Sequence, residues 1–439
     1  MNLTATFTYN TLYRIVNIAL VYAIVVFVSK LAGVAGYGLL SILIVNATFY
    51  NLASSFGADA GITYHSANAT LQPGKITTII FCTLTLQMII LGVIRILSYD
   101  FISGVSLIQN NLKTYWWSAC LFLLSISLTE KYTAFFNGHY LFNLCGKLLV
   151  FTNLLTLIVF LFLFFYSPVH EVVYVVTVYV GMAFFQSLVL VTIFHLRIKK
   201  SFSIGMVSYR EIKSFLSFSI IAFITNIIQF MAYRADYWLV DYFRTEKELG
   251  WYSLAVRLVQ VFWVLPLLFA GILFPQVAKE KGLYDENKML SFIRVLFCVN
   301  FLGGLLAFFL VQWMIPVVFG KIYDGSIVPF QILLPGIILF CPTTVIAAFF
   351  AGRGQLLTNL FGSSINFVFI VLIDILLIPS LGIKGAAIAS SIGYTLTSIY
   401  FITVYCRQTQ TPFYQLFYPR MSDWHDLRAS IYKICIKET

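Results

Sequence analysis

Long apolar runs dominate the chain, and polar residues gather in the short segments between them. A helix needs about 20 apolar residues to cross the hydrocarbon core of a bilayer, and each run is close to that length. The pattern therefore predicts an all-α polytopic membrane protein with about 12 transmembrane helices. The runs that we interpret as spans are 9–29, 39–64, 76–98, 114–135, 144–166, 172–196, 215–240, 250–274, 289–314, 329–350, 359–379 and 385–406.

Composition supports this interpretation. Of the 439 residues, 60% are hydrophobic and 10% are charged, and the mean hydropathy is +0.90. A soluble domain is about 25% charged, and even one of 300 residues leaves about a quarter of its chain surface exposed. These values exclude a soluble enzyme, a nucleic-acid-binding protein and a disordered chain.

The net charge of +11 indicates topology rather than a nucleic-acid partner. If the N-terminus is cytoplasmic, 18 of the 28 Lys and Arg residues fall on the cytoplasmic side and eight on the outer side. Lys and Arg accumulate in cytoplasmic loops of membrane proteins. We therefore predict a multi-pass membrane protein with both termini in the cytoplasm.

The chain is predicted to contain two halves of the same orientation. Segment 348–353 (AFFAGR) resembles 134–139 (AFFNGH) at an offset of 214 residues, and 250–253 (GWYS) faces 38–41 (GLLS) at an offset of 212. Parallel repeats of this kind place a transporter's substrate site between the halves. We expect six-helix bundles at 1–196 and 215–406, joined by a basic cytoplasmic linker at 197–214 and followed by a cytoplasmic tail at 407–439.

The sequence predicts neither a cofactor nor a metal site. The seven cysteines contain no CxxC pair, and the five histidines lack the spacing of metal ligands. Proline is concentrated in the second half, where Pro266, Pro335 and Pro342 fall inside spans. Proline kinks a helix because its ring clashes and its N–H is missing, so these positions predict either hinges or static kinks.

Two arginines, Arg14 and Arg257, lie inside predicted spans. An intramembrane charge is costly and often marks function, and a guanidinium can hold phosphate with two hydrogen bonds at once. Gln260 shares a helical face with Arg257. The alternative is that each arginine extends its charged end to the nearest interface.

The seventh span carries a polar stripe, in which Asn226, Gln229, Tyr233 and Asp236 fall on one helical face. Arg234 lies beside them. The stripe is interpreted as the wall of a hydrophilic cavity, or as a polar seam that joins helices.

Other spans contain candidates for ion coupling. Asn46, a candidate for the substrate cavity, lies on a polar face of the second span, with Asp59 further along, and Asp374 lies in the eleventh. Asp59 and Asp374 are candidates to bind a proton or a cation, or they are satisfied by nearby Arg or Ser side chains. Glu130 is expected to form a local pair with Lys131.

Several segments resemble one family. They are LAG at 31–33 with YGLLS at 37–41, FGADAGI at 56–62, RADY at 234–237 with LGWYSLA at 249–255, FP at 274–275, AGR at 351–353, and LIPSLGIKGAAIA at 377–389. They are similar to the Wzx-type O-antigen and polysaccharide flippases of the multidrug/oligosaccharidyl-lipid/polysaccharide exporter superfamily.

The resemblance implies a MATE-like fold of two six-helix bundles around a central cavity. It implies a flippase, not an enzyme, that moves a polyprenyl-diphosphate-linked oligosaccharide of O-antigen, capsule or exopolysaccharide synthesis across the bacterial inner membrane. Related lipid II flippases have cavity arginines on the first and eighth helices, which correspond by helix position to Arg14 and Arg257. Implied partners are the lipid-linked substrate, membrane lipids, a polysaccharide polymerase and glycosyltransferases. No match to the acidic cation site of the drug-exporting branch is found.

Two other functions remain open at this point. A drug or organic-cation exporter of the same superfamily would need acidic groups in its cavity. A membrane polysaccharide polymerase or ligase would present a long outer loop with catalytic groups, and every predicted outer loop is short.

Overall fold

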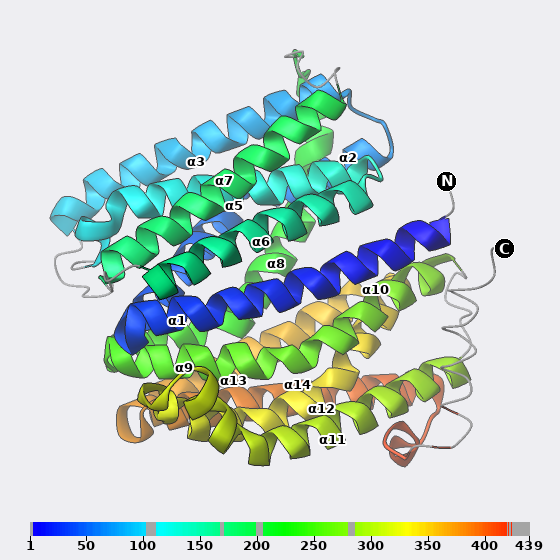
Figure 1. Ribbon diagram of the computed structural model, residues 1–439. Coiled ribbons are helices and arrows are strands. Elements are labelled where there is room, and N and C mark those ends of the chain that lie inside the picture. Colours follow the sequence, from blue (N-terminus) through cyan, green and yellow to red (C-terminus); the bar gives the residue numbers. More distant parts are fainter. Residues whose placement is uncertain are drawn as a thin grey trace. The chain divides into compact units, whose positions relative to one another are not determined.

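The computed structural model describes residues 3–101, 111–166, 171–198, 205–279, 286–418, 420 and 423 (Figure 1). Over these residues the chain is helical, without a strand. The first element, α1 (Leu3–Ser55), contains a break at Gly33, where φ is 68° and ψ is −179°. Its apolar part, Leu12–Ser55, has 44 residues. At ~1.5 Å per residue it is roughly twice as long as a ~30 Å hydrocarbon core, which identifies two successive spans.

The other predicted spans also form helices. The remaining helices of the described chain are α2 (Ala58–Ala67), α3 (Pro73–Phe101), α5 (Asn111–Gly138), α6 (Phe142–Tyr166), α7 (Val172–Arg197), α8 (Tyr209–Phe243), α9 (Glu246–Val259), α10 (Val264–Lys279), α11 (Glu286–Val318), α12 (Ile327–Gly352), α13 (Leu356–Leu381) and α14 (Ile383–Thr409). Eleven stretches in the described part of the chain are long and apolar enough to cross a membrane, and the longest is the double one at its start.

The predicted eighth span is divided into α9 and α10 by a 3₁₀ turn, η2 (Gln260–Trp263). Pro266 follows this turn and has no N–H to donate to the carbonyl of Phe262. The Cys341 thiol donates to that carbonyl instead, with Sγ and O 3.5 Å apart. In contrast, α12 stays helical through Pro335 and Pro342. Of the three prolines predicted inside spans, the one at 266 therefore accompanies a change of helix type.

The chain forms two compact units, and they divide within α8, between Ile227 and Ile228, rather than in the predicted linker at 197–214. The reason is packing by the first half of α8 onto the N-terminal unit. There, Phe215 joins a buried core with Ile62, and the carbonyl of Ser219 lies against Gly57. Part of the predicted linker, 209–214, is the first turn and a half of α8, and 199–204 lies outside the described residues.

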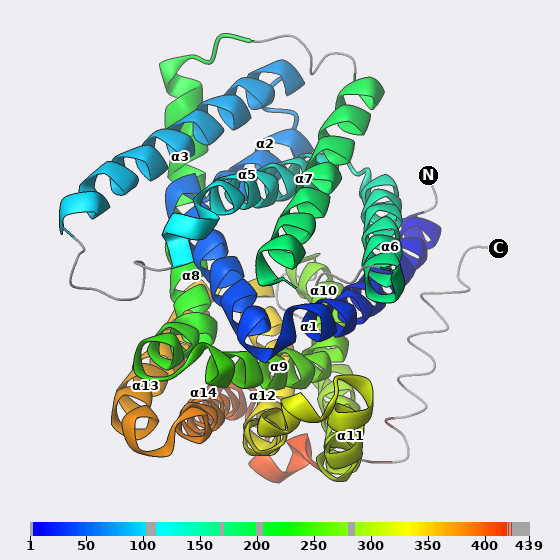
Figure 2. The ribbon, with the colours of Figure 1, turned by 60° about the vertical axis from the view of Figure 1, so that its left-hand side comes forward.

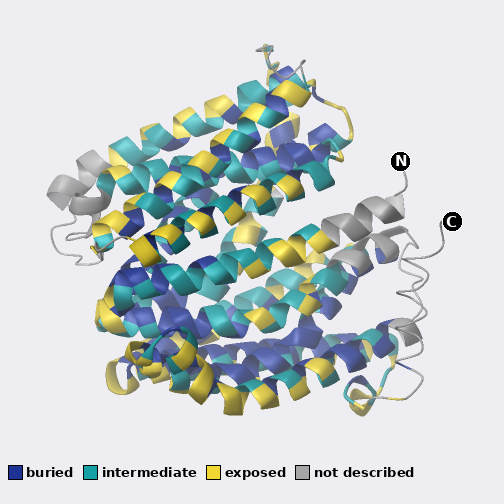
Figure 3. Ribbon diagram, in the orientation of Figure 1, coloured by how far each residue is buried: buried dark blue, intermediate teal, exposed yellow. Residues whose placement is uncertain are grey.

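Each unit has its own core. In the N-terminal unit, Phe135 and Phe136 of α5 pack against Phe194 of α7. In the C-terminal unit, α12 and α13 both pack against α14, and these three helices lie side by side in Figures 1 and 2. By contrast, exposed apolar side chains such as Leu306 and Phe309 lie along α11, where exposed residues recur in Figure 3. Such surfaces suit contact with lipid rather than water.

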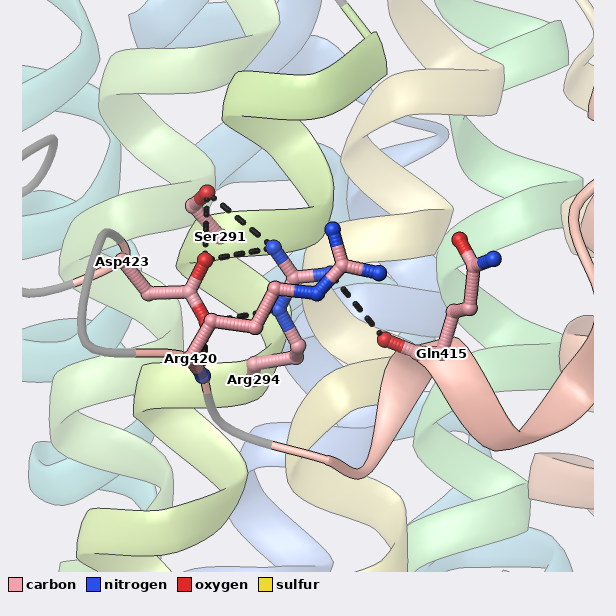
Figure 4. Close-up of polar contacts among 5 residues, drawn as sticks. All are labelled: Ser291, Arg294, Gln415, Arg420 and Asp423. Carbon is pink, nitrogen blue, oxygen red and sulfur yellow. Dashed lines mark hydrogen bonds and ion pairs between the residues drawn. The ribbon is translucent and has the colours of Figure 1, made fainter.

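The segment after α14 folds back onto the C-terminal unit. A short 3₁₀ turn, η4 (Phe413–Leu416), places Leu416 in the core with no exposed area. Beyond it, the buried Asp423 accepts hydrogen bonds from Arg294 and Ser291 of α11 (Figure 4). The distance from Arg294 Nε to Asp423 Oδ2 is 2.7 Å. We call this buried ion pair and its hydrogen bonds the tail clasp. The predicted cytoplasmic tail thus includes at least one ordered, buried attachment.

Candidate functional site

Two residues proposed from sequence meet in the C-terminal unit. Arg234 of α8 donates through Nη2 to Oε1 of Gln260, which begins η2, at 3.5 Å. The Arg234 guanidinium also lies over the Tyr237 ring, 5.1 Å from its centroid. Arg257 is half-buried on α9, one turn before Gln260. These residues place two guanidinium groups on α8 and α9 within one helical unit.

An aromatic cluster lies next to these cations. Tyr233 packs against Trp263 at 5.2 Å between ring centroids and against Tyr394 at 6.4 Å. Phe340 of α12 completes the cluster, 5.4 Å from Tyr394. Of the four, only Tyr233 was predicted as a site residue. The other three could not be recognised as site residues from the sequence, because aromatic residues are common throughout it.

Asp236, the last member of the predicted stripe, is a junction between helices. Its Oδ1 accepts from the Tyr237 amide at 2.9 Å, and its Oδ2 accepts from the Tyr252 hydroxyl and from Ser390 Oγ at 3.4 Å. Asp236 thus connects α8 to α9 and α14. Its geometry fits the polar-seam alternative, since a buried carboxylate with several donors is satisfied.

The rest of the stripe does not form one surface. Asn226 and Gln229 are exposed on α8, whereas Tyr233 is half-buried and Asp236 is 3% exposed. The face predicted from spacing therefore passes from an exposed part to a buried part. Asn226 also belongs to the N-terminal unit, and the other three residues belong to the C-terminal unit.

Asp374 of α13 has no exposed area, and neither of its carboxylate oxygens has a hydrogen-bond partner among the described residues. It interacts electrostatically with Asp236. About two turns before it, Asn366 donates to the carbonyl of Ala232 at 3.2 Å. The sequence suggested that Arg or Ser would satisfy Asp374, and among the described residues neither does so.

The N-terminal unit places its predicted residues differently. Arg14 is exposed on α1, and Asn46 is half-buried on the same element. Asp59 lies in the first turn of α2, with its Oδ1 buried and without a hydrogen-bond partner among the described residues. Asp59 also lines a cavity of about 400 Å³, together with Glu130 and hydroxyl-bearing residues of α2 and α5.

A buried charge in this unit was not recognised as a site from the sequence. Lys131 of α5 has no exposed area and donates to Ser127 Oγ at 2.6 Å and to Gln87 Oε1 at 3.3 Å. Gln87 of α3 in turn donates to Asn51 Oδ1 at 3.0 Å. Glu130 accepts a hydrogen bond from Asn51, and it also interacts electrostatically with the adjacent Lys131, as the sequence predicts.

Asp59 interacts electrostatically with both Lys131 and Glu130. The three groups therefore form a polar cluster on α2 and α5, in which Lys131 is buried and the two acidic residues are half-buried, and Asn51 and Gln87 complete it. In the sequence this cluster is visible as an adjacent Glu–Lys pair inside an apolar run. Such a pair is equally expected at the membrane interface, so it does not identify this cluster. Within the described residues, no three His, Cys, Asp or Glu side chains gather as ligands for a metal ion.

Solved structures with this fold are membrane transporters. An inward-facing multidrug resistance MATE family transporter of the MOP superfamily has a TM-score of 0.70 and 14% identity, covering 94% of this chain and 96% of that one. The lipid II flippase MurJ, in an inward closed conformation, has a TM-score of 0.68 and 13% identity, covering 99% and 98%. A MOP superfamily transporter from Pyrococcus furiosus has a TM-score of 0.61 and 15% identity, covering 93% and 96%.

At these identities the structural likeness establishes the fold alone. No curated protein matches the sequence. The sequence itself matches the family described as polysaccharide biosynthesis protein over residues 27–328. This match covers both units, from the first span to the start of α12. The chain therefore belongs to the polysaccharide biosynthesis protein family.

Proposed function

We propose that this protein is a flippase that moves a polyprenyl-diphosphate-linked oligosaccharide across the bacterial inner membrane by alternating access. Membership of the polysaccharide biosynthesis family and the transporter fold support a membrane flippase. The observation that carries the choice of substrate is the grouping of Arg234, Gln260 and an aromatic cluster in the C-terminal unit. Cations suit a diphosphate, and aromatic faces suit sugar rings.

Five of the candidate residues have a role in this scheme. Arg14 and Arg257 hold the diphosphate in turn, with Arg234 and Gln260 supporting the second position. Tyr233 stacks against a sugar of the repeat unit. The polyprenyl tail remains in lipid, because moving it through a polar site would cost its hydrophobic transfer energy.

The biological setting follows from the same proposal. The glycan is a repeat unit of O-antigen (as in lipopolysaccharide), capsule or exopolysaccharide. Glycosyltransferases acting on the cytoplasmic side supply the substrate, and a polymerase on the outer side consumes it. Both termini lie in the cytoplasm.

The buried carboxylates supply a route for ion coupling. Asp59 and Glu130 carry two acidic groups beside the single ammonium group of Lys131. An uncompensated charge inside the membrane costs ~2.5–3.5 kcal/mol on insertion scales. Uptake of one proton or one monovalent cation would balance the cluster. In the C-terminal unit, Asp374 is proposed to take up a proton or cation in the same way.

The role of Arg257 is tested by polymer export in a strain that depends on this protein. Arg257→Ala should abolish export while the protein remains in the membrane at its normal level. Arg257→Lys keeps a charge but loses the bidentate fork, and should retain partial export. Arg407→Ala, which removes an exposed cation from the end of α14, is the control and should export normally. Normal export with Arg257→Ala would overturn the assignment.

A drug or organic-cation exporter is the alternative that a specific observation favours, because Asp59 and Glu130 line one cavity. In that case, Asp59→Asn should abolish resistance to cationic drugs and leave polymer export intact. The flippase proposal expects the reverse, with export impaired and drug resistance unchanged.

A further inference from the structure

A second cavity in the N-terminal unit lies at the connection between α5 and α6. Its volume is about 560 Å³, and it is lined by the turn around Tyr140, the first turns of α6 and the last turn of α7. The three helices lie together in Figures 1 and 2. None of the residues that line this cavity belongs to the substrate or ion sites described above.

The charged groups of this cavity are both cationic. Lys147 comes from α6 and Arg197 from the end of α7, and both are exposed. Neither side chain has an ion-pair partner in the described part of the chain. Among the described residues, no Asp or Glu lines the cavity. Two cations from different helices thus face a space to which the described residues bring no compensating negative charge.

The start of α6 adds polar groups to the same cavity. The amide of Cys145 donates to the carbonyl of Leu141 at 3.0 Å, so the amides at 142–144 precede the repeating hydrogen bonds of the helix. The positive end of a helix dipole favours an anion at that position. Asn143 also lines the cavity, and its buried Oδ1 has no hydrogen-bond partner among the described residues. Since the two ends of an amide are interchangeable by rotation, Asn143 can present its N–H₂ group as a donor.

The apolar residues at the rim indicate that the ligand is anchored in the membrane. Leu196 is 63% exposed and Tyr140 is 57% exposed, beside the two cations. A soluble anion gains nothing from such a surface, whereas the chain of a lipid covers it. Tyrosine is also typical of the membrane–water interface.

We propose that this cavity binds the phosphate headgroup of a membrane lipid in the cytoplasmic leaflet. Lys147 and Arg197 contact the phosphate oxygens, Asn143 and the first turn of α6 donate further hydrogen bonds, and the lipid chain lies over Leu196. Basic pockets between helices on the cytoplasmic side are suited to anionic headgroups. The proposal does not depend on the transported substrate.

The test measures lipid binding to the full-length protein in detergent, by native mass spectrometry with defined lipids. Phosphatidylglycerol is the anionic probe, phosphatidylcholine is the neutral comparison, and inorganic pyrophosphate is the soluble competitor. We expect Lys147→Gln or Arg197→Gln to weaken phosphatidylglycerol binding about fivefold each, and the double variant roughly 25-fold. Lys147→Arg should preserve binding, and Arg407→Gln is the matched exposed control on the other unit.

Two results would overturn the proposal. The first is equal phosphatidylglycerol affinity in the double variant and the unmodified protein. The second is displacement of the lipid by an equal concentration of pyrophosphate, which would identify a site for free phosphate instead. A polyprenyl diphosphate added as a third probe distinguishes a resident phospholipid from the transported lipid. Because binding is measured on purified protein, failure of this site and failure of polymer export are separate observations.

Discussion

The tail clasp gives the most quantitative prediction. In Asp423→Asn the side chain keeps its size but loses its charge, and it leaves Arg294 buried at 4% exposure without a counter-ion. The contacts at stake are well defined. Asp423 Oδ2 accepts from Arg294 Nε and from the Arg420 amide, both at 2.7 Å, and Oδ1 accepts from Ser291 Oγ at 2.9 Å (Figure 4).

Removal of one partner from a buried ion pair costs about 3–5 kcal/mol. The lower value is appropriate here, because asparagine can still accept hydrogen bonds through its amide oxygen. At ~1.4 kcal/mol per factor of ten, 3 kcal/mol corresponds to a roughly 150-fold larger population with the tail detached. Local opening of this kind leaves the helices folded.

Trypsin cleavage after Arg420 reports on this opening, because the clasp must release before the chain can enter the protease. Cleavage tracks the open population when reclosing is fast. We expect Asp423→Asn to accelerate cleavage about 150-fold, as followed by mass spectrometry of the released fragment. Asp324→Asn makes the same chemical change at an exposed position of the same unit and should cleave as the unmodified protein does. A cleavage rate for Asp423→Asn within twofold of that control would refute the reasoning.

The remaining predictions concern other buried contacts. Burial alone would raise the pKa of Asp423, but its bonds from Arg294 and the Arg420 amide hold the pKa below the ordinary 3.8. The clasp therefore contributes stability above pH 3.8 and loses this stability as the pH falls through the native pKa. Hydrogen exchange of the 411–418 peptide should accelerate in that range in the unmodified protein but not in Asp423→Asn. Gly57→Ala should destabilise the N-terminal unit, because φ is +72° and the new Cβ would lie 2.2 Å from the carbonyl oxygen of Ser219; an unchanged melting temperature in detergent would contradict this. Lys131→Met leaves two carboxylates without their ammonium group and should lower the membrane-inserted level several-fold, a result that quantitative immunoblotting would show or exclude.

The helices were predictable because one physical signal specifies them. Apolar runs of spanning length must form helices in lipid, where each backbone group needs an internal partner. The break between the first two spans, in contrast, depends on a single residue, Gly33, whose conformation the hydropathy pattern does not reveal. The predicted linker at 197–214 extends into α8, which begins at Tyr209. The basic first turns of α8 carry no apolar signal, whereas Phe215 and Ser219 just beyond them pack into the N-terminal unit.

The candidate sites were predictable only in part. Arg234 and Gln260, both chosen from the sequence as polar residues in or beside predicted spans, are hydrogen-bonded to each other. The hydrogen bonds of Asp236 could not be predicted from residue spacing. Periodicity identifies the helical face on which Asp236 lies, but not the donors on the helices opposite it. Those donors, Tyr252 and Ser390, come from α9 and α14. The cluster around Lys131 was missed for the same reason, since its partners lie on other helices.

The location of lipid-linked repeat units in cells without this protein tests the central claim most directly. Deletion of the gene, followed by enzymatic labelling of the glycan from the outer side of the inner membrane, distinguishes the two faces. A flippase predicts single repeat units that accumulate on the cytoplasmic face, protected from the label until the gene is restored. Repeat units that are labelled at once on the outer face would contradict the account and assign the chain to a later step.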